Sequence, residues 1–176
     1  LVVDLTPPAP ATVVSQLTND NTPAISGTAN VAASEYLTVT VNGITYTDGD
    51  GNLTRTSTNW SLTIPLGDAL ADGTYNVTAT IHDAAGNFTN DVTSSELVVD
   101  TTPPAIAITA ITNDSGTAGD FITNDQTLIF SGTAEAGLTV TVTLKDAGNA
   151  VVFTTSVVAT GGNWSVDRTA AAALAN

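Results

Sequence analysis

The sequence predicts an all-β protein made of two tandem sandwich domains, and three observations lead to that prediction. First, short runs such as Leu37, Val39 and Val41 alternate with polar residues, which is the period-two pattern of half-buried strands. Second, Gly, Asn, Asp and Pro interrupt these runs about every 8–12 residues, as in sandwiches and barrels. Third, a set of short motifs occurs twice, which indicates two copies of one domain.

The repeated motifs set the expected domain boundaries. Leu1-Val-Val-Asp returns as Leu97-Val-Val-Asp, Ser26-Gly-Thr-Ala returns as Ser131-Gly-Thr-Ala, and Asn59-Trp-Ser returns as Asn163-Trp-Ser. We expect residues 1–4 to be the final strand of a preceding repeat, residues 5–100 to form one domain and residues 101–176 the next. The second copy has an acidic insertion near 113–125 and stops before the last strands of the pattern. We therefore expect a truncated repeat, cut from a longer array.

Alternation and turn residues define the expected strands of the first copy. Seven or eight short strands in about 100 residues match an immunoglobulin-like sandwich. Trp60 and Trp164 begin equivalent strands, and each is expected to anchor a core. Helix-like stretches at 68–72 and 169–175 are expected to be single turns between strands. The strands are predicted near 10–17, 23–29, 36–42, 44–47, 53–57, 60–65, 74–82 and 92–99.

Composition excludes several classes of protein. The chain has 17 acidic and three basic residues and a formal net charge of −14. It therefore lacks the positive surface that nucleic acid or an anionic membrane requires. Cysteine is absent, which excludes disulfides, thiolate metal sites and a cysteine nucleophile. No apolar run approaches the roughly 18 residues of a membrane span. Disorder is not expected, because the mean hydropathy is +0.20 and 42% of the residues are hydrophobic.

An enzyme is not expected from this sequence. His82 is the only histidine, and it lies beside Asp83 on the polar face of a predicted strand. No Gly-x-Ser-x-Gly elbow or other activated nucleophile accompanies it. We interpret His82 as a solvated strand histidine.

A carbohydrate- or ice-binding module is the main alternative to a structural repeat. Rows such as Thr139, Thr141 and Thr143 could present regularly spaced hydroxyl groups. Outward threonine is also ordinary on soluble strands. Sugar-binding platforms need exposed aromatic rings, and only 5% of the residues are aromatic.

The motifs, taken in order, resemble a known family. Val-Asp-Thr-Thr-Pro-Pro at a junction is joined by Thr-Asn-Asp, Ser-Gly-Thr-Ala, Asn-Trp-Ser, Ala-Asp-Gly-Thr-Tyr and Asp83-Ala-Ala-Gly-Asn87. This order resembles the bacterial Ig-like extender repeats of giant repeats-in-toxin-type adhesins, which Gram-negative bacteria export by type I secretion. The resemblance implies an extracellular stalk at the bacterial surface, packed end to end with neighbouring repeats and stiffened by calcium ions at its linkers.

The acidic residues in predicted turns are suitable calcium ligands. Calcium prefers six to eight oxygen ligands from carboxylates, amides and carbonyls. In an Ig-type topology the loops gather at two opposite poles, and carboxylates packed at one pole repel each other unless a cation joins them. We expect Glu135 to lie near Asp100 at the junction of the two domains, and three acids to lie in the insertion. The predicted ligands are Asp4, Asp83, Asp100, Asp114, Asp120, Asp125 and Glu135.

Each candidate ligand also has a purely structural interpretation. Asp48-Gly-Asp-Gly-Asn52 begins like an EF-hand loop but lacks the Gly and Glu that complete one, so a hairpin turn is expected. Asp83 to Asn87 can form a tight turn alone, and Asp4 and Asp100 can cap turns.

The truncated second domain is expected to expose a sheet edge and part of its core. Another chain could complete it, for example through the Leu1-Val-Val strand, or residues beyond Asn176 could do so.

Overall fold

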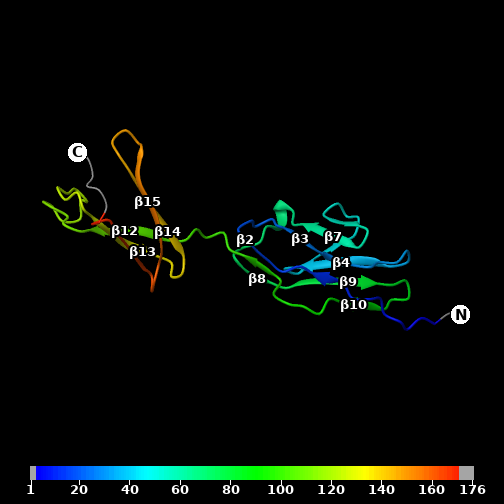
Figure 1. Cartoon of the computed structure of the whole chain (residues 1–176). Helices are drawn as coiled ribbons and strands as arrows, with labels where there is room; N and C mark the ends of the chain where they lie inside the picture. The colour runs from blue at the N-terminus through cyan, green and yellow to red at the C-terminus, as the bar shows by residue number, and fades with distance from the viewer. Residues whose placement is uncertain (1–2, 171–176) are drawn as a thin grey trace. The chain divides into compact units, whose positions relative to one another are not determined.

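The computed structural model describes residues 3–170, which form two all-β units and contain no α-helix (Figure 1). The predicted fold class is confirmed. The two compact units are Leu1–Thr102, here called unit 1, and Pro103–Asn176, called unit 2. Val3 and Asp4 are in no regular strand. The described residues exclude Leu1 and Val2, and also residues 171–175 of the expected turn at 169–175.

The first sheet of unit 1 is antiparallel and contains four strands in the order β1-β3-β7-β6. The Ser-Gly-Thr motif lies on β3 and the Asn-Trp-Ser motif on β7, and the two strands pair so that Gly27 faces Trp60. Two motifs far apart in sequence are therefore direct neighbours in the sheet. The strands are β1 Thr12–Val13, β3 Ala24–Thr28, β6 Leu53–Thr56 and β7 Asn59–Thr63.

The opposing layer of unit 1 has two parts, in the orders β10-β9-β4-β5 and β2-β11-β8. Only Asn76 separates β8 from β9, so the two parts share one chain segment. A short 3₁₀ helix, η1 Leu66–Asp68, precedes β8. The strands are β2 Gln16–Thr18, β4 Tyr36–Val41, β5 Ile44–Thr47, β8 Gly73–Tyr75, β9 Val77–His82, β10 Phe88–Asn90 and β11 Leu97–Val99.

The strand expected at 10–17 is two strands, because the chain changes layers between Val13 and Gln16. β1 pairs antiparallel with β3, and Val14 N still donates to Ser26 O at 2.9 Å. Gln16 N then donates to Glu96 O at 2.7 Å, and β2 runs parallel to β11. Because of this crossing, one chain segment supplies an edge strand to each of the two layers.

Between β10 and β11 the chain leaves the sheet, and two carboxylates supply the hydrogen-bond acceptors that a neighbouring strand would provide for β9. The expected strand 92–99 is regular only over β11, so β9 loses its neighbour at Val77 and Ala79. Val77 N donates to Glu96 Oε2 at 2.9 Å, and Ala79 N donates to Asp91 Oδ1 at 2.8 Å. Buried amides need acceptors, which explains why Glu96 is only 2% exposed in an apolar core.

The core of unit 1 lies between the two layers and includes Trp60, which is 1% exposed. Leu37, Val39 and Val41 of β4 are buried, as the alternation predicts. The Trp60 indole donates to Thr12 O at 3.1 Å, and Trp164 of unit 2 donates to Thr133 O at the same distance. Both tryptophans are buried, which confirms their predicted roles as core anchors.

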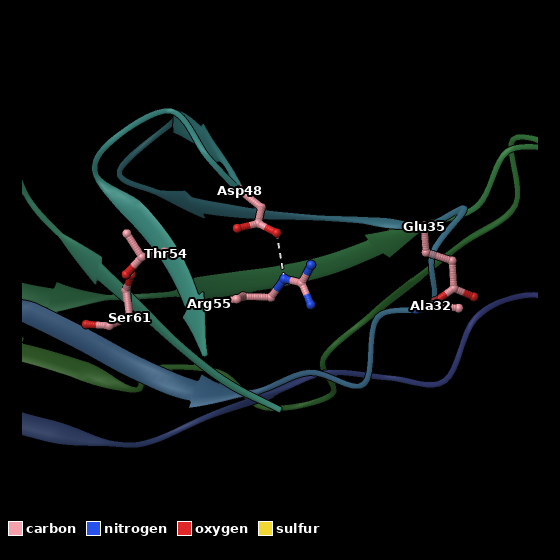
Figure 2. Close-up of polar contacts among 6 residues, drawn as sticks. All are labelled: Ala32, Glu35, Asp48, Thr54, Arg55 and Ser61. Atoms are coloured by element: carbon pink, nitrogen blue, oxygen red, sulfur yellow. Dashed lines mark hydrogen bonds and ion pairs between the residues drawn. The ribbon is translucent and has the colours of Figure 1, made fainter. Parts of the chain in front are cut away.

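The open side of the unit 1 sandwich is closed by an ion pair. Arg55 on β6 contacts Asp48, which follows β5, with Nε and Oδ2 2.6 Å apart (Figure 2). Asp50 accepts from Thr47 N and Leu53 N at 2.8 and 2.9 Å. The segment Asp48 to Asn52 is thus a turn that links the two layers. The expected hairpin is wrong, because β5 pairs with β4 and β6 pairs with β7, so the strands on either side of the turn lie in different sheets.

Unit 2 repeats part of this arrangement. Sheet order β12-β13-β16 brings Gly132 opposite Trp164, and β14 pairs with β15 in a second, two-stranded sheet. After β16, residues up to 170 contain no counterpart of β8 to β11. The strands are β12 Ile106–Ile111, β13 Ile129–Ala134, β14 Thr139–Lys145, β15 Val151–Val158 and β16 Asn163–Asp167.

Candidate metal sites

The turn from Asp83 to Asn87 is organised around one carboxylate. Ala85 N and Asn87 N donate to Asp83 Oδ1 at 2.9 and 2.8 Å, and Asn87 Nδ2 donates to Asp83 Oδ2 at 2.8 Å. The hydrogen bond from the Asn87 side chain is the largest cause that lowers the pKa of Asp83. The carboxylate is therefore held as an anion, and the tight turn forms with protein donors alone.

Three predicted or neighbouring acids lie at this end of unit 1. Asn87 Nδ2 also donates to Asp4 O at 3.2 Å, so the first residues of the chain are tied to the β9–β10 turn. Glu35 Oε2 accepts from Ala32 N at 2.8 Å in the turn before β4, which Figure 2 also shows. Asp4, Glu35 and Asp83 line one open hollow of about 600 Å³. These acids share one hollow, and their role as calcium ligands stays a prediction.

Asp100, at the other end of unit 1, lies beside an acid that we did not predict as a site residue. Thr102 N donates to Asp100 Oδ1 at 3.1 Å. Asp72, in the loop before β8, accepts from Thr101 N and Thr101 Oγ1 at 2.9 and 2.6 Å, and from Thr102 Oγ1 at 2.7 Å. These bonds lower the pKa of Asp72, with the Thr101 hydroxyl as the largest cause. Asp72 thus fixes the start of the linker to unit 1.

The Asp-x-Thr pattern recurs before each Pro-Pro pair. Thr6 N donates to Asp4 Oδ1 at 3.0 Å, just as Thr102 N donates to Asp100 Oδ1. The turn-capping interpretation of Asp4 and Asp100 therefore has direct support, and each carboxylate keeps a second oxygen.

The insertion of unit 2 is an acidic loop between β12 and β13. Asn113 Nδ2 donates to Asp125 Oδ2 at 2.6 Å and Thr123 Oγ1 donates to Asn113 O at 2.6 Å, so the two ends of the loop meet. Asp120 Oδ1 accepts from Ile122 N at 2.9 Å. The pKa of Asp125 is lowered, chiefly by the hydrogen bond from Thr127 N.

Asp114 differs from the other acids of the loop. Its Oδ2 accepts from Gly119 N at 2.6 Å, whereas its Oδ1 is buried and has no hydrogen-bond partner among the described residues. A buried carboxylate oxygen without a donor costs free energy unless a cation or water satisfies it. Asp114 is thus the predicted ligand whose surroundings most need an ion.

Glu135 lies in the turn between β13 and β14, where Leu138 N donates to its carbonyl at 3.3 Å. Its expected proximity to Asp100 concerns two separate units and stays a prediction. Within residues 3–170, no three acidic or histidine side chains are grouped closely enough to ligate one metal ion. Backbone carbonyls and amides would have to supply much of any coordination shell, as calcium permits. The side chain of Asn113, which donates to Asp125, is a contact that reasoning from the acidic residues alone did not predict.

His82 is less solvated than its place on the polar face suggested. Its ring stacks on Tyr36 with centroids 4.7 Å apart and lies 5.9 Å from the ring of Phe88. Thr38 Oγ1 and His82 Nε2 are 3.2 Å apart. The register explains this group, because Tyr36 and Phe88 are both cross-strand partners of His82. The two outer rings are exposed, Tyr36 by 48% and Phe88 by 58%.

Comparison with known proteins identifies the repeat. A family model described as "Bacterial Ig-like domain" matches residues 9–101 and again residues 102–175. Among solved structures, the BSP domain of a biofilm associated protein is similar, with 20% identity and a TM-score of 0.31. That match covers 90% of this chain, which spans 24% of that structure's chain. No curated protein matches. Within the described residues, no helix is long and apolar enough to cross a membrane.

Proposed function

The chain belongs to the bacterial Ig-like domain family, and we propose that it is an extender segment in the stalk of a large bacterial surface adhesin. In this role the two units are spacers, exported by type I secretion as part of a repeats-in-toxin-type protein and located outside the cell. Their neighbours are repeats of the same chain. The order of the sequence motifs and the match to the family support this assignment.

Calcium is the proposed cofactor, and the acidic loop of unit 2 is its first proposed site. The observation that carries this proposal is the buried Oδ1 of Asp114, which has no donor among residues 3–170. Asp120 and Asp125 lie in the same loop, and the lowered pKa of Asp125 keeps that carboxylate charged. The loop also contains Asn113, whose carbonyl and amide oxygens are ligands that calcium accepts.

The two linker-facing ends of unit 1 are the further proposed sites. Asp4 and Asp83 line the hollow at one end, and Asp100 lies beside Asp72 at the other. Glu135, in the β13–β14 turn of unit 2, is a further proposed ligand. An ion at such a position would neutralise adjacent carboxylates and restrict the linker Asp100-Thr-Thr-Pro-Pro, whose prolines already favour an extended path.

Calorimetric titration of the whole chain with calcium tests the loop site. We expect saturable binding, and we expect Asp114→Asn to weaken the tightest step by at least about tenfold, since a charged ligand is lost. Asp146→Asn is the matched control, because Asp146 is an acid of unit 2 in the β14–β15 turn that accepts from Ala150 N. Equal binding by the native chain and the Asp114 variant would refute the loop site.

Thermal unfolding and small-angle scattering test the proposed role of the ions. Calcium is expected to raise the melting temperature and to narrow the distribution of inter-unit distances, and a chelator is expected to reverse both. If the melting curve and the scattering profile are the same in calcium and in chelator, calcium does not stiffen this chain.

A second candidate function, glycan binding, is favoured by one observation. Tyr36 and Phe88, on either side of His82, present two exposed aromatic rings on β4 and β10. They lie on the same face of the sheet as the paired threonines of β4 and β9, which are Thr38, Thr40, Thr78 and Thr80. A glycan array probed in calcium tests it. Reproducible binding that is lost in Tyr36→Ala, while Tyr75→Ala binds normally, would favour this function over a purely structural role.

A further inference from the structure

β15 is a long sheet edge without the charges, prolines or glycines that protect many edge strands, and its pairing with β14 is irregular only at Val152. Its eight residues, Val151 to Val158, include no charge, no proline and no glycine. Within the described part of the chain it pairs only with β14, so its other edge has free backbone donors and acceptors. Exposed edges of this kind pair readily with further strands, which is why most proteins shorten, charge or cover them.

Unit 1 protects the equivalent edge. There β5 has four residues, and the chain then turns at Asp48 and crosses as β6 to the other layer, where it pairs with β7. Arg55 and Asp48 place an ion pair at this crossing (Figure 2). In unit 2 the chain stays in one sheet throughout β15, and no charged residue interrupts it.

Strands that complete the repeat would leave this edge open. In unit 1, β9 pairs with the edge of β4 that faces away from β5. Strands equivalent to β9 and β10 would therefore add to the free edge of β14 and not to β15. The hairpin of β14 and β15 appears in yellow and orange in Figure 1.

The sequence of β15 is complementary to itself when two copies run antiparallel about Thr155. A two-fold axis normal to the sheet keeps the core-facing side of one copy on the same side as that of the other. Residues opposite each other must then point to the same face, so both must have odd numbers or both must have even numbers. With Thr155 opposite Thr155, Val152 faces Val158, Phe153 faces Val157 and Thr154 faces Ser156. Every pair joins residues of similar polarity, and the β-branched and aromatic pairs are those that stabilise sheets.

The exposure pattern fits this register. Val152, Thr154, Ser156 and Val158 are exposed on the outer face, with Val152 46% and Val158 54% exposed, whereas Phe153 and Val157 pack against the unit 2 core. Pairing would cover the two exposed valines with each other and would align Thr154 and Ser156, which already contact Thr143 and Thr141 on β14.

We propose that β15 is a homophilic docking edge, at which a second copy of this chain adds its own β15 in antiparallel register. The product is a continuous sheet in the order β14-β15-β15-β14, and the two chains run in opposite directions. An eight-residue edge buries little surface, so one contact is weak. Several such edges along a repetitive chain would act together through effective concentration.

Sedimentation equilibrium of the 176-residue chain, up to roughly millimolar concentration, measures this self-association. The double variant Thr154→Lys, Ser156→Lys places lysines opposite each other across the axis. We expect it to raise the dimer dissociation constant by at least about tenfold. Thr45→Lys, Thr47→Lys on β5 makes the same charge change on the edge of unit 1 and should leave the constant unchanged. A monomeric native chain, or association that survives the β15 lysines, would overturn the proposal.

Cysteine crosslinking tests the register, since the chain has no cysteine of its own. A mixture of Val152→Cys and Val158→Cys chains is expected to form a mixed disulfide dimer under mild oxidation. Each variant alone should crosslink little, because like positions lie six residues apart along the paired strands. Equal crosslinking by either variant alone would refute the antiparallel register. Both experiments are expected to give the same result in calcium and in chelator, because β15 has no carboxylate.

Discussion

The indole ring of Trp60 occupies the space in which a side chain at Gly27 would stand. A Cβ built at Gly27 lies 2.5 Å from Trp60 Cζ2 and 1.9 Å from the carbonyl oxygen of Thr12. Gly132 and Trp164 repeat the relationship in unit 2, with the same 2.5 Å separation. The two recurring motifs of the sequence, Ser-Gly-Thr and Asn-Trp-Ser, are thus the two halves of one packing contact.

Gly27→Ala is expected to destabilise unit 1 by about 3 kcal/mol, because the strand or the ring must shift to admit the methyl group. Urea unfolding followed by two-dimensional amide NMR measures the change, since it separates the signals of the two units. Gly67→Ala is the control: a Cβ at Gly67 meets nothing within 4 Å, so its effect should be within about 0.5 kcal/mol. Equal effects of the two substitutions would contradict the packing argument.

Protonation of Asp72 is expected to release the start of the linker. Hydrogen bonds from Thr101, with its hydroxyl first, and from Thr102 lower the pKa of Asp72 in the folded state. A depressed pKa stabilises the fold above the unfolded value of about 3.9, and that contribution is lost as the pH falls through the folded pKa.

The NMR shift of the Thr101 amide should therefore move only below about pH 3.9. Asp72→Asn removes the titrating group, and its Thr101 amide should show no such inflection. A Thr101 titration centred above the ordinary aspartate value would be inconsistent with the hydrogen bonds described.

Tyr46 is expected to ionise above the usual range of a tyrosine pKa. Burial, followed by the hydrogen bond that its hydroxyl donates to Asp68 Oδ2 at 2.8 Å, raises the pKa of Tyr46 to about 12. Because the folded pKa lies above the unfolded value of about 10, stability should fall as the pH rises between these values. Ultraviolet titration should show one late step, absent in Tyr46→Phe. Ionisation of Tyr46 near the ordinary tyrosine value of about 10 would disprove the assignment.

Arg168→Ile is expected to stabilise unit 2. Arg168 is 6% exposed and occupies the position of Ile64 in unit 1, since Arg168 N donates to Leu128 O as Ile64 N donates to Pro23 O. Its Nε and Nη1 have no partner among residues 3–170, although the guanidinium lies over the ring of Phe153.

Removing these unpaired buried donors should add about 1–3 kcal/mol of stability. The reverse substitution, Ile64→Arg, should destabilise unit 1 by a similar amount. Thermal unfolding of both variants provides the measurement, and a lower melting temperature for Arg168→Ile would contradict the expectation.

The alternation of residues was sufficient to predict the strands whose two faces differ. Leu37, Val39 and Val41 are buried as expected, and both tryptophans lie in the cores. The passage of the first strand from one layer to the other could not be predicted, because polarity does not mark it: Val14 and Leu17 are apolar yet exposed, by 55% and 74%. Short β10 was missed because Phe88 is its only apolar residue, and that ring is exposed.

The acids could be placed in turns from the sequence, but their partners could not. Asp114 and Asp125 lie in the insertion as expected, yet the link between Asn113 and Asp125 depends on loop geometry that carboxylate spacing does not contain. Glu96 and Arg168 were unexpected as buried residues, because charged side chains are normally exposed. Glu96 is buried because its carboxylate accepts from the free amide of Val77 on β9. Arg168 is buried because it occupies the core position that Ile64 has in unit 1.

The parallel pairing of β2 with β11 determines how unit 1 responds to tension. Gln16, Leu17 and Thr18 lie beside Leu97, Val98 and Val99 in that order. β2 follows the two-residue β1 near the start of the unit, and β11 is its last strand. Once β1 has separated from β3, a force on the two ends therefore pulls β2 and β11 lengthwise past each other. The hydrogen bonds between them are then loaded in shear and share the force, whereas peeling would break them one at a time. Strand order alone therefore gives this unit resistance to extension.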